Sequence, residues 1–291
     1  MPFDRVLNSR VIETVYEVKR FLDSESYEDV KPEIERLRVE VDSENWKFEV
    51  LRDVRVVGVD GSQLRYLKEF GVPFGAVQVA KLILIHGKGE YRVDYRTKWV
   101  ESDKSLDLER FELELKTMLE ELESDILFFD GSFSVSFANQ YRKDIRDRYF
   151  QLISEFLEKS KNRAFVVGFI DRSYSKDLFR PYDSFILKNY LRNFEYTEPM
   201  PCTELNDVFF SYLKIGNSVV RVEFPKWMAG MHDVFMRYVV AECLLGSTRQ
   251  YPYVLERAHM YAVISERERE IIGKMIGREI SYKWMAKYLR R

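Results

Sequence analysis

Runs of apolar residues, and stretches in which apolar and polar residues alternate, mark the predicted strands of this chain. Short apolar runs predict strands at 54–60, 124–130 and 163–171. The stretches 75–87 and 89–100 alternate apolar and polar residues and are joined by the turn sequence HGKG, which predicts a β-hairpin. These strands are the expected core of a sheet.

Apolar residues at helical spacing fill most of the remaining chain. The expected helices span 3–22, 28–39, 104–123, 139–160 and 183–192. The prediction of the first helix is based on the helical spacing of Val11, Val15, Val18 and Leu22. A second hairpin is expected at 207–223. After about residue 230 the chain is predicted to be helical, with a break near 246–253.

The order of these elements predicts the fold class. Strand, hairpin, helix, strand, helix and strand, followed by helices, is an α/β arrangement. It is the order of the ribonuclease H-like fold, a mixed sheet flanked by helices. No internal repeat or Gly/Ser linker divides the chain. We therefore expect an N-terminal helical extension at 1–45 and one elaborated domain at 46–291 with a helical C-terminal part.

Composition narrows the class of protein. The 291 residues are 46% hydrophobic and 32% charged, which is typical of a globular protein with a charged surface. No apolar run approaches the roughly 20 residues of a membrane span. The N-terminus lacks the layout of a signal peptide, so a cytoplasmic location is expected. Abundant Glu, Lys and Arg with scarce Asn and Gln are typical of thermophile proteins.

Cysteine and histidine are rare, which restricts the possible chemistry. Cys202 and Cys243 form no CxxC pair, so a disulfide framework or a cysteine zinc site is not expected. The three histidines are His86, His232 and His259. A formal net charge of −2 gives no overall attraction to nucleic acid, but phosphate binding depends on local clusters of charge.

Two predicted strands end in the same way. VVGVDGSQ (56–63) and ILFFDGSF (126–133) each run from apolar residues into Asp-Gly-Ser. Each motif alone also fits an ordinary strand-terminating turn. If the strands are neighbours, Asp60 and Asp130 meet at one sheet edge, where a divalent cation would offset their repulsion. Oxygen ligands suit Mg²⁺ or Mn²⁺, and Gly61 and Gly131 are then expected to let the backbone turn away without a side chain that blocks the metal.

The helix that precedes the second motif supplies further carboxylates. Its glutamates are Glu109, Glu112, Glu114, Glu120, Glu121 and Glu123. Glu112 and Glu114 lie beside the apolar stripe, so either one can reach inward, and periodicity does not separate them. A solvent-facing position is the alternative for each glutamate.

A third group of residues lies in QYPYVLERAHMYA (250–262). Pro252 suits a helix start, with Tyr251 before it and His259 within the helix. An imidazole in this position can ligate a metal, orient water or protonate a leaving group. A structural histidine is the alternative.

These motifs together resemble a known family. GVDGS, FFDGS and YPYVLERAH, in this order and with VVGFIDRS and VVRVEFPKW between them, resemble the NurA family of DNA-end-processing nucleases over about residues 50–280. The resemblance implies a ribonuclease H-like homodimer that hydrolyses DNA with Mn²⁺. The implied activities are 5′-to-3′ exonuclease and single-strand endonuclease. The implied partner is the hexameric HerA translocase, in resection of double-strand breaks for recombination.

The resemblance also assigns residues. Asp60 and Asp130 match the metal-binding aspartates, His259 the late histidine, and Tyr251 the tyrosine before it. Glu114 best matches the helix glutamate, with Glu112 as the alternative. The implied ion is Mn²⁺, with Mg²⁺ as a substitute, and the implied substrates are single-stranded DNA and duplex ends. For strand binding, the segments 139–149 and 281–291 combine basic and aromatic residues. The alternatives are a solvated helix face and, at the C-terminus, a dimer or partner contact.

Two other functions fit part of the pattern. Actin-like and sugar-kinase-like ATP-binding proteins also place Asp-Gly turns at strand ends. They usually carry a duplicated fold and a glycine-rich adenosine site, and neither is evident in this sequence. The second alternative is a non-catalytic scaffold that docks on an ATPase ring. A haloacid dehalogenase-type phosphatase needs Asp-x-Asp on its first strand. Here Gly58 stands two residues before Asp60, in place of the first aspartate, so this class is discounted.

Overall fold

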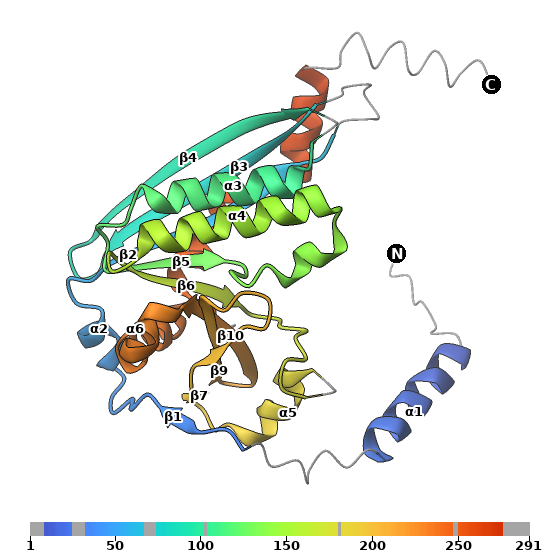
Figure 1. Cartoon of the computed structure of the whole chain (residues 1–291), viewed down its shortest axis with the longest axis vertical. Coiled ribbons are helices and arrows are strands. Elements are labelled where there is room, and N and C mark those ends of the chain that lie inside the picture. Colours follow the sequence, from blue (N-terminus) through green and yellow to red (C-terminus); the bar gives the residue numbers. More distant parts are fainter. Residues whose placement is uncertain are drawn as a thin grey trace, which may run out of the picture.

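The computed structural model describes residues 9–24, 33–66, 74–101, 104–179, 182–246 and 250–275 (Figure 1). Its centre is a mixed sheet of ten strands. In spatial order the strands are β1 (Arg36–Arg38), β7 (Glu195–Thr197), β9 (Val208–Ile215), β10 (Ser218–Pro225), β6 (Phe165–Ile170), β5 (Ile126–Asp130), β2 (Arg55–Leu64), β3 (Phe74–Ile85) and β4 (Glu90–Glu101). The tenth strand, β8 (Met200–Pro201), pairs with β9.

Helices cover both faces of the sheet. In chain order they are α1 (Ser9–Ser24), α2 (Trp46–Val50), α3 (Leu106–Leu119), α4 (Lys143–Ser160), α5 (Asp183–Tyr190), α6 (His232–Leu245) and α7 (Tyr253–Ala262). Short 3₁₀ helices lie at η3 (Ser136–Gln140) and η4 (Lys226–Met231), and residues 266–275 are helical. Helices α3 and α4 lie side by side on one face (Figure 1). None of the helices in the described ranges combines the length and apolar character that a bilayer span requires.

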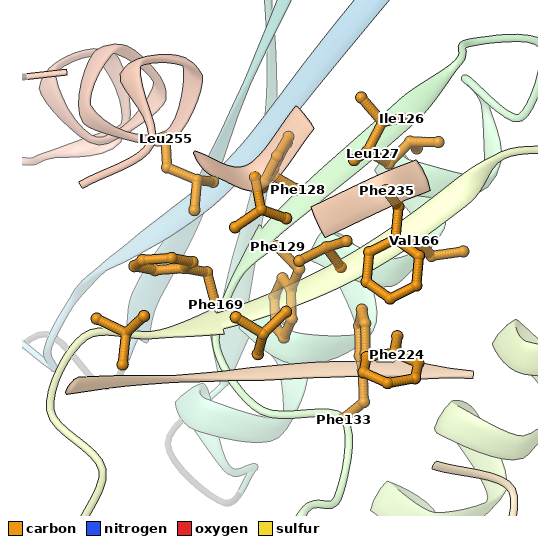
Figure 2. Packing of buried hydrophobic residues seen from close by; sticks show 14 of the residues in the cluster. Ile126, Leu127, Phe128, Phe129, Phe133, Val166, Phe169, Phe224, Phe235 and Leu255 are labelled. Carbon is orange, nitrogen blue, oxygen red and sulfur yellow. The ribbon is translucent and has the colours of Figure 1, made fainter. Parts of the chain in front are cut away.

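The middle of the sheet is parallel and completely buried. β5 pairs in parallel with β2 on one side and β6 on the other, while the remaining pairs are antiparallel. Parallel strands with both faces covered consist of continuous apolar residues, and β5 begins with four of them, Ile126 to Phe129. Their side chains pack with Phe224 of β10, Phe235 of α6 and Leu255 of α7 (Figure 2).

Glycines on opposite faces of β2 show which helix covers which face. A Cβ at Gly58 would lie 2.7 Å from the Val254 carbonyl oxygen of α7, and one at Gly61 would lie 2.3 Å from Glu114 Oε1 of α3. Residues three apart on a strand point to opposite faces. Helices α7 and α3 therefore pack closely on the two sides of the same strand.

Most of the expected elements are present. The predicted ribonuclease H-like α/β fold is confirmed by the mixed sheet between helical layers. The N-terminal helix is present as α1, and residues 3–8 of its predicted range lie outside the described residues. The helix predicted at 28–39 is wrong where the chain is described, because 36–38 form β1 and pair with β7. Alternating Leu37 and Val39 form a strand pattern, and both side chains pack on the core.

Candidate metal centre

The structure brings the two Asp-Gly-Ser aspartates together at one edge of the parallel core. β2 and β5 are parallel neighbours in the register Val59 opposite Phe129, so Asp60 and Asp130 follow at adjacent positions. Parallel strands carry their carboxyl ends to the same edge of a sheet, which is where α/β proteins bind ligands. The predicted proximity of the two carboxylates is therefore a feature of the fold.

The backbone does not turn after Asp60, however, so the role predicted for Gly61 is wrong. β2 continues to Leu64 because β3 pairs with it along its whole length, to Leu64 opposite Ala76. The neighbour on the other side, β5, ends at Asp130, which leaves the Asp60 side chain at an open edge. Gly61 instead provides space: any side chain there would overlap the Glu114 carboxylate.

His259 reaches the same point from helix α7. Its Nδ1 lies 2.7 Å from Asp60 Oδ2, while Asp60 Oδ1 accepts a hydrogen bond from the Gly61 amide at 2.7 Å. Ligand atoms of Asp60, Asp130 and His259 all lie within 4.8 Å of one another. The Asp60 side chain is buried, whereas the imidazole is largely exposed. The group thus opens to solvent on the α7 side.

A buried glutamate fixes the start of α7. Glu242 of α6 is fully buried, and its Oε2 accepts a hydrogen bond of 2.9 Å from the Val254 amide in the first turn of α7. Its Oε1 lies 2.5 Å from His86 Nε2. An unsatisfied helix N-terminus is stabilised by such a carboxylate. Glu242 was not selected from the sequence, since it lies on an apolar helix with no motif around it.

Tyr251 lies just before α7 and contacts Asp130. Its hydroxyl donates a hydrogen bond to the Asp130 carboxylate, and its ring packs edge-on against Phe169 with centroids 5.3 Å apart. Burial and the neighbouring carboxylate raise the Tyr251 pKa well above its usual value. The hydroxyl therefore stays protonated and holds Asp130 in place.

The structure separates the two alternative helix glutamates. Glu114 is buried, faces Gly61 and has Arg110 Nε at 3.6 Å from its Oε1. Glu112 is turned away and pairs with Lys116 at 2.8 Å and with Arg148 at 3.0 Å. Glu114 is therefore the glutamate of α3 that lies beside the aspartates.

The electrostatics of the group favour a cation. Burial raises the pKa of Glu114 to about 8, with the Asp60 and Asp130 charges adding to the shift and Arg110 opposing it. Burial and the Asp60 charge raise the pKa of Asp130 to about 6. The pKa of Asp60 is also raised by burial, although His259 acts against the shift. A divalent ion would stabilise the ionised form of these three interacting carboxyl groups.

The sequence across these elements carries a family signature. The NurA domain matches residues 54–264, which is well over half of the chain and includes every residue of the group. The chain belongs to the NurA family. The resemblance inferred from the motifs is confirmed, and membership supports a nuclease role.

Solved NurA structures share the fold. The NurA nuclease from Sulfolobus solfataricus superposes with a TM-score of 0.63 at 16% identity, covering 94% of this chain and 95% of that one. A NurA bound to dAMP and manganese gives a TM-score of 0.52 at 10% identity, covering 92% and 96% of the two chains. The comparison with curated protein sequences finds no match.

The residues of this NurA-family site suit Mn²⁺ or Mg²⁺. Carboxylate oxygens are the donors that both ions take, and one imidazole among them is compatible with Mn²⁺. Asp60, Asp130 and His259 already lie close enough to share an ion. Glu114 is not part of that group, but its buried carboxylate lies within electrostatic reach of both aspartates. The donor set therefore fits the ion that the family resemblance implies.

Sequence reasoning missed two charged neighbours of the site. Asp171 directly follows the apolar strand β6, whereas Asp130 is the last residue of β5, and the charge of Asp171 contributes to the raised pKa of Asp130. The same signal, an apolar strand running into aspartate, could have identified it. Arg110 precedes Glu114 by one helical turn, and its Nη1 lies 3.5 Å from the Gly61 carbonyl oxygen. It is the cation nearest to Glu114 along α3.

The two segments expected to bind a DNA strand differ in outcome. In 139–149, Tyr149 is buried against Phe111 and the Tyr141 hydroxyl lies 3.2 Å from Asp107, so both rings belong to the fold. The basic residues Arg142 and Lys143 remain exposed. The segment 281–291 lies outside the described residues.

Proposed function

We propose that this NurA-family chain is a divalent-metal-dependent deoxyribonuclease that hydrolyses DNA phosphodiester bonds, with Mn²⁺ as the preferred ion and Mg²⁺ as a substitute. The observation that carries the proposal is the convergence of Asp60, Asp130 and His259, with buried Glu114 beside them. A manganese- and dAMP-bound relative with the same fold supports the choice of ion and substrate.

Asp60, Asp130, Glu114 and His259 are the residues that would hold the metal. When bound, a divalent ion supplies Lewis-acid chemistry, activating water and stabilising the leaving oxygen of a phosphodiester. The protein supplies orientation. The Asp60 carboxylate holds the His259 ring, and the Tyr251 hydroxyl holds Asp130. Groups that fix ligands in this way commonly change metal affinity or activity 10–100-fold when removed.

The finer assignments rest on the family resemblance. We propose 5′-to-3′ exonuclease and single-strand endonuclease activities in double-strand break resection, with single-stranded DNA and duplex ends as substrates. The proposed partner is a hexameric HerA-type ATPase, and the proposed state is a cytoplasmic homodimer. We also propose the division into an extension at 1–45 and a nuclease domain at 46–291, with α1 available for contact with the ATPase ring.

Replacement of the strand-end aspartates tests the site. Asp60→Asn and Asp130→Asn are each expected to reduce Mn²⁺-dependent cleavage of single-stranded DNA by about 100-fold or more, because each removes a charged metal ligand. Mn²⁺ should raise the melting temperature of the parent chain but hardly that of the double variant. The matched control is Asp147→Asn, which removes an exposed carboxylate on α4 paired with Arg146.

Cleavage at the parental rate by either folded variant would show that the metal acts elsewhere. A folded parent chain that cleaves no DNA with Mn²⁺ or Mg²⁺ would instead favour the scaffold function. Substrates blocked at the 5′ or the 3′ end by phosphorothioate linkages would then assign the polarity of the exonuclease.

A further inference from the structure

The connection between β6 and α5 leaves the sheet beside the metal centre (Figure 1). β6 is the parallel neighbour of β5 in the register Phe169 opposite Asp130, so the two strands end at the same edge. The chain then passes Asp171, whose charge contributes to the raised pKa of Asp130. An extended chain advances by at most about 3.6 Å per residue, so the Cα atom of Tyr174 lies within about 11 Å of that of Asp171. The connection is therefore close enough to contact a DNA strand that reaches the metal centre.

Two exposed tyrosines and two exposed cations form the surface of this connection. Tyr174 is 70% exposed, and Tyr182, just before α5, is 45% exposed. Their rings meet edge-on, with centroids 5.4 Å apart. The Lys176 ammonium nitrogen lies 5.0 Å from the centre of the Tyr182 ring. The Arg172 side chain is 77% exposed, with its Nε 3.8 Å from Asp171. We call Arg172, Tyr174, Lys176 and Tyr182 the β6–α5 surface.

A buried carboxylate fixes the backbone of the connection. Asp183, the first residue of α5, is fully buried, and it accepts hydrogen bonds from three backbone amides at 2.9, 3.1 and 3.0 Å, those of Asp177, Leu178 and Phe179. The Tyr212 hydroxyl of β9 donates to the same carboxylate at 2.8 Å. A loop without such bonds would have to be ordered by its ligand, at a cost in free energy. The β6–α5 surface is therefore presented by a preorganised support.

The chemistry of the β6–α5 surface matches a single strand of nucleic acid. Proteins bind single strands by stacking bases on aromatic rings and by pairing cations with the phosphates. Tyr174 provides an open ring, whereas the Tyr182 ring holds the Lys176 ammonium. Lysine is depleted at protein interfaces. A lysine beside exposed tyrosines therefore favours a phosphate backbone over a protein surface.

We propose that the β6–α5 surface binds single-stranded DNA on the β6 side of the metal centre, with a base stacked on Tyr174 and with Arg172 and Lys176 paired to phosphates. The inference rests on the proposed nuclease function and adds to it a binding surface for the strand. Stacking on an aromatic ring tolerates any sequence, because every base has a π-face. The surface is therefore suited to strands of any sequence.

Helix α2 carries a matched pair of residues away from the metal centre. The Lys47 ammonium nitrogen lies 5.2 Å from the centre of the Phe48 ring, and Phe48 is 55% exposed. α2 precedes the amino end of β2, whereas the metal centre lies at the carboxyl end of β5, the parallel neighbour of β2. Replacements in α2 therefore control for the general effect of removing an exposed ring or a cation.

Binding of a fluorescein-labelled oligothymidylate tests the surface in the full chain, by anisotropy in EDTA so that no cleavage occurs. Tyr174→Ala should raise the dissociation constant about 10-fold, because a stacked base loses its ring. The double variant Arg172→Gln, Lys176→Gln should reduce the slope of log K against log salt by about 1.4, since each phosphate contact on a single strand contributes about 0.7. Phe48→Ala and Lys47→Gln should leave both quantities at the parental value.

Cleavage kinetics separate the surface from the metal centre. With Mn²⁺, Tyr174→Ala should raise the KM for single-stranded DNA about 10-fold and leave kcat unchanged, because it removes binding that is equal in the ground and transition states. Hydrolysis of bis(p-nitrophenyl) phosphate, which carries no base to stack, should proceed at the parental rate. A parent chain that binds the oligonucleotide through this surface but cleaves no DNA would contradict the proposed function and not the surface.

Three results would overturn the proposal. Parental binding by Tyr174→Ala, or an unchanged salt slope in the Arg172→Gln, Lys176→Gln variant, would make the β6–α5 surface a contact for a protein instead. Equal weakening by the α2 variants would show a general effect of surface charge and apolar area. Slower hydrolysis of the small phosphodiester by Tyr174→Ala would show that Tyr174 acts on the metal centre and not on the strand. The replaced side chains of the surface are exposed, and melting temperatures verify that each variant is folded.

Discussion

At the scale of single residues, the site depends on a glycine that is present for space rather than for backbone freedom. Gly61 lies within an extended strand, where any residue could adopt the backbone conformation. A side chain there would occupy the position of the Glu114 carboxylate, because the added Cβ would lie 2.3 Å from Oε1. The Glu114 carboxylate can therefore occupy its position on α3 only because Gly61 of β2 has no side chain.

Gly61→Ala should displace Glu114 and impair the metal site. We expect cleavage to fall about 10-fold or more and the Mn²⁺-induced rise in melting temperature to shrink, because a ligand moved by even 1 Å loses much of its effect. Nuclease rates and thermal shifts measure the two effects. Gly230→Ala is the control, since a Cβ at Gly230 meets no atom within 4 Å. Equal metal binding in both variants would contradict a role for Glu114.

At the scale of elements, buried glutamates hold the segments that carry the site. Glu242 of α6 receives the first turn of α7. Glu223 of β10 accepts hydrogen bonds of 2.9 Å from the Ser132 hydroxyl and the Ser134 amide, and so holds the loop that follows Asp130. Arg221 donates to the other Glu223 oxygen at 2.7 Å, which balances the buried charge. The start of α7 and the loop after Asp130 are therefore each held by an element outside the site.

Glu242→Ala should loosen α7 and carry His259 away from Asp60. The Val254 amide and the His86 ring would lose their shared partner, which costs about 1–3 kcal/mol for a buried group left unsatisfied. We expect a lower melting temperature together with a cleavage rate reduced about 10-fold or more. Glu256→Ala, also on α7, is the control for a general effect of helix charge. A stability loss without a change in cleavage would contradict the positioning role.

At the scale of the whole molecule, folding brings together carboxyl groups whose negative charges repel one another. The pKa of Glu114 rises from its ordinary 4.5 to about 8 and that of Asp130 from 3.8 to about 6. A carboxyl with a raised pKa in the fold binds more protons there than in the unfolded chain. Ionising it therefore lowers the free energy of unfolding. This cost is absent at acid pH, grows between the ordinary pKa of each group and its raised pKa in the fold, and is complete above about pH 8.

The melting temperature of the metal-free chain should fall as pH rises from about 4 to about 8, and part of this fall should disappear in Glu114→Gln. Mn²⁺ competes with protons for the same oxygens, so its affinity and its stabilising effect should rise over the same range. Thermal unfolding with and without Mn²⁺ across pH measures both. A metal-free stability that is flat across this window would contradict the raised pKa values.

Much of the fold was predictable because its signals are local. The apolar run of β5, the alternation in β3 and β4, and the helical spacing of α3 and α4 each reflect the burial of that segment alone. The short strands were not predictable from the sequence pattern. β7 and β8 have three and two residues, too few for any periodicity, and the pattern around β1 predicts part of a helix. Their strand character comes from the neighbours with which they pair.

From the sequence alone it follows that two apolar runs lead into aspartates, that a late helix carries a histidine, and that these motifs follow the order of the NurA family. Three features follow from the three-dimensional arrangement alone: Glu114 rather than Glu112 faces Gly61 and is buried near the aspartates, β2 continues past Asp60, and Asp171 lies within electrostatic reach of Asp130. The reason is physical: periodicity reports whether a residue is buried, whereas a metal site requires groups far apart in the chain to converge, and only sheet register and helix packing set those distances.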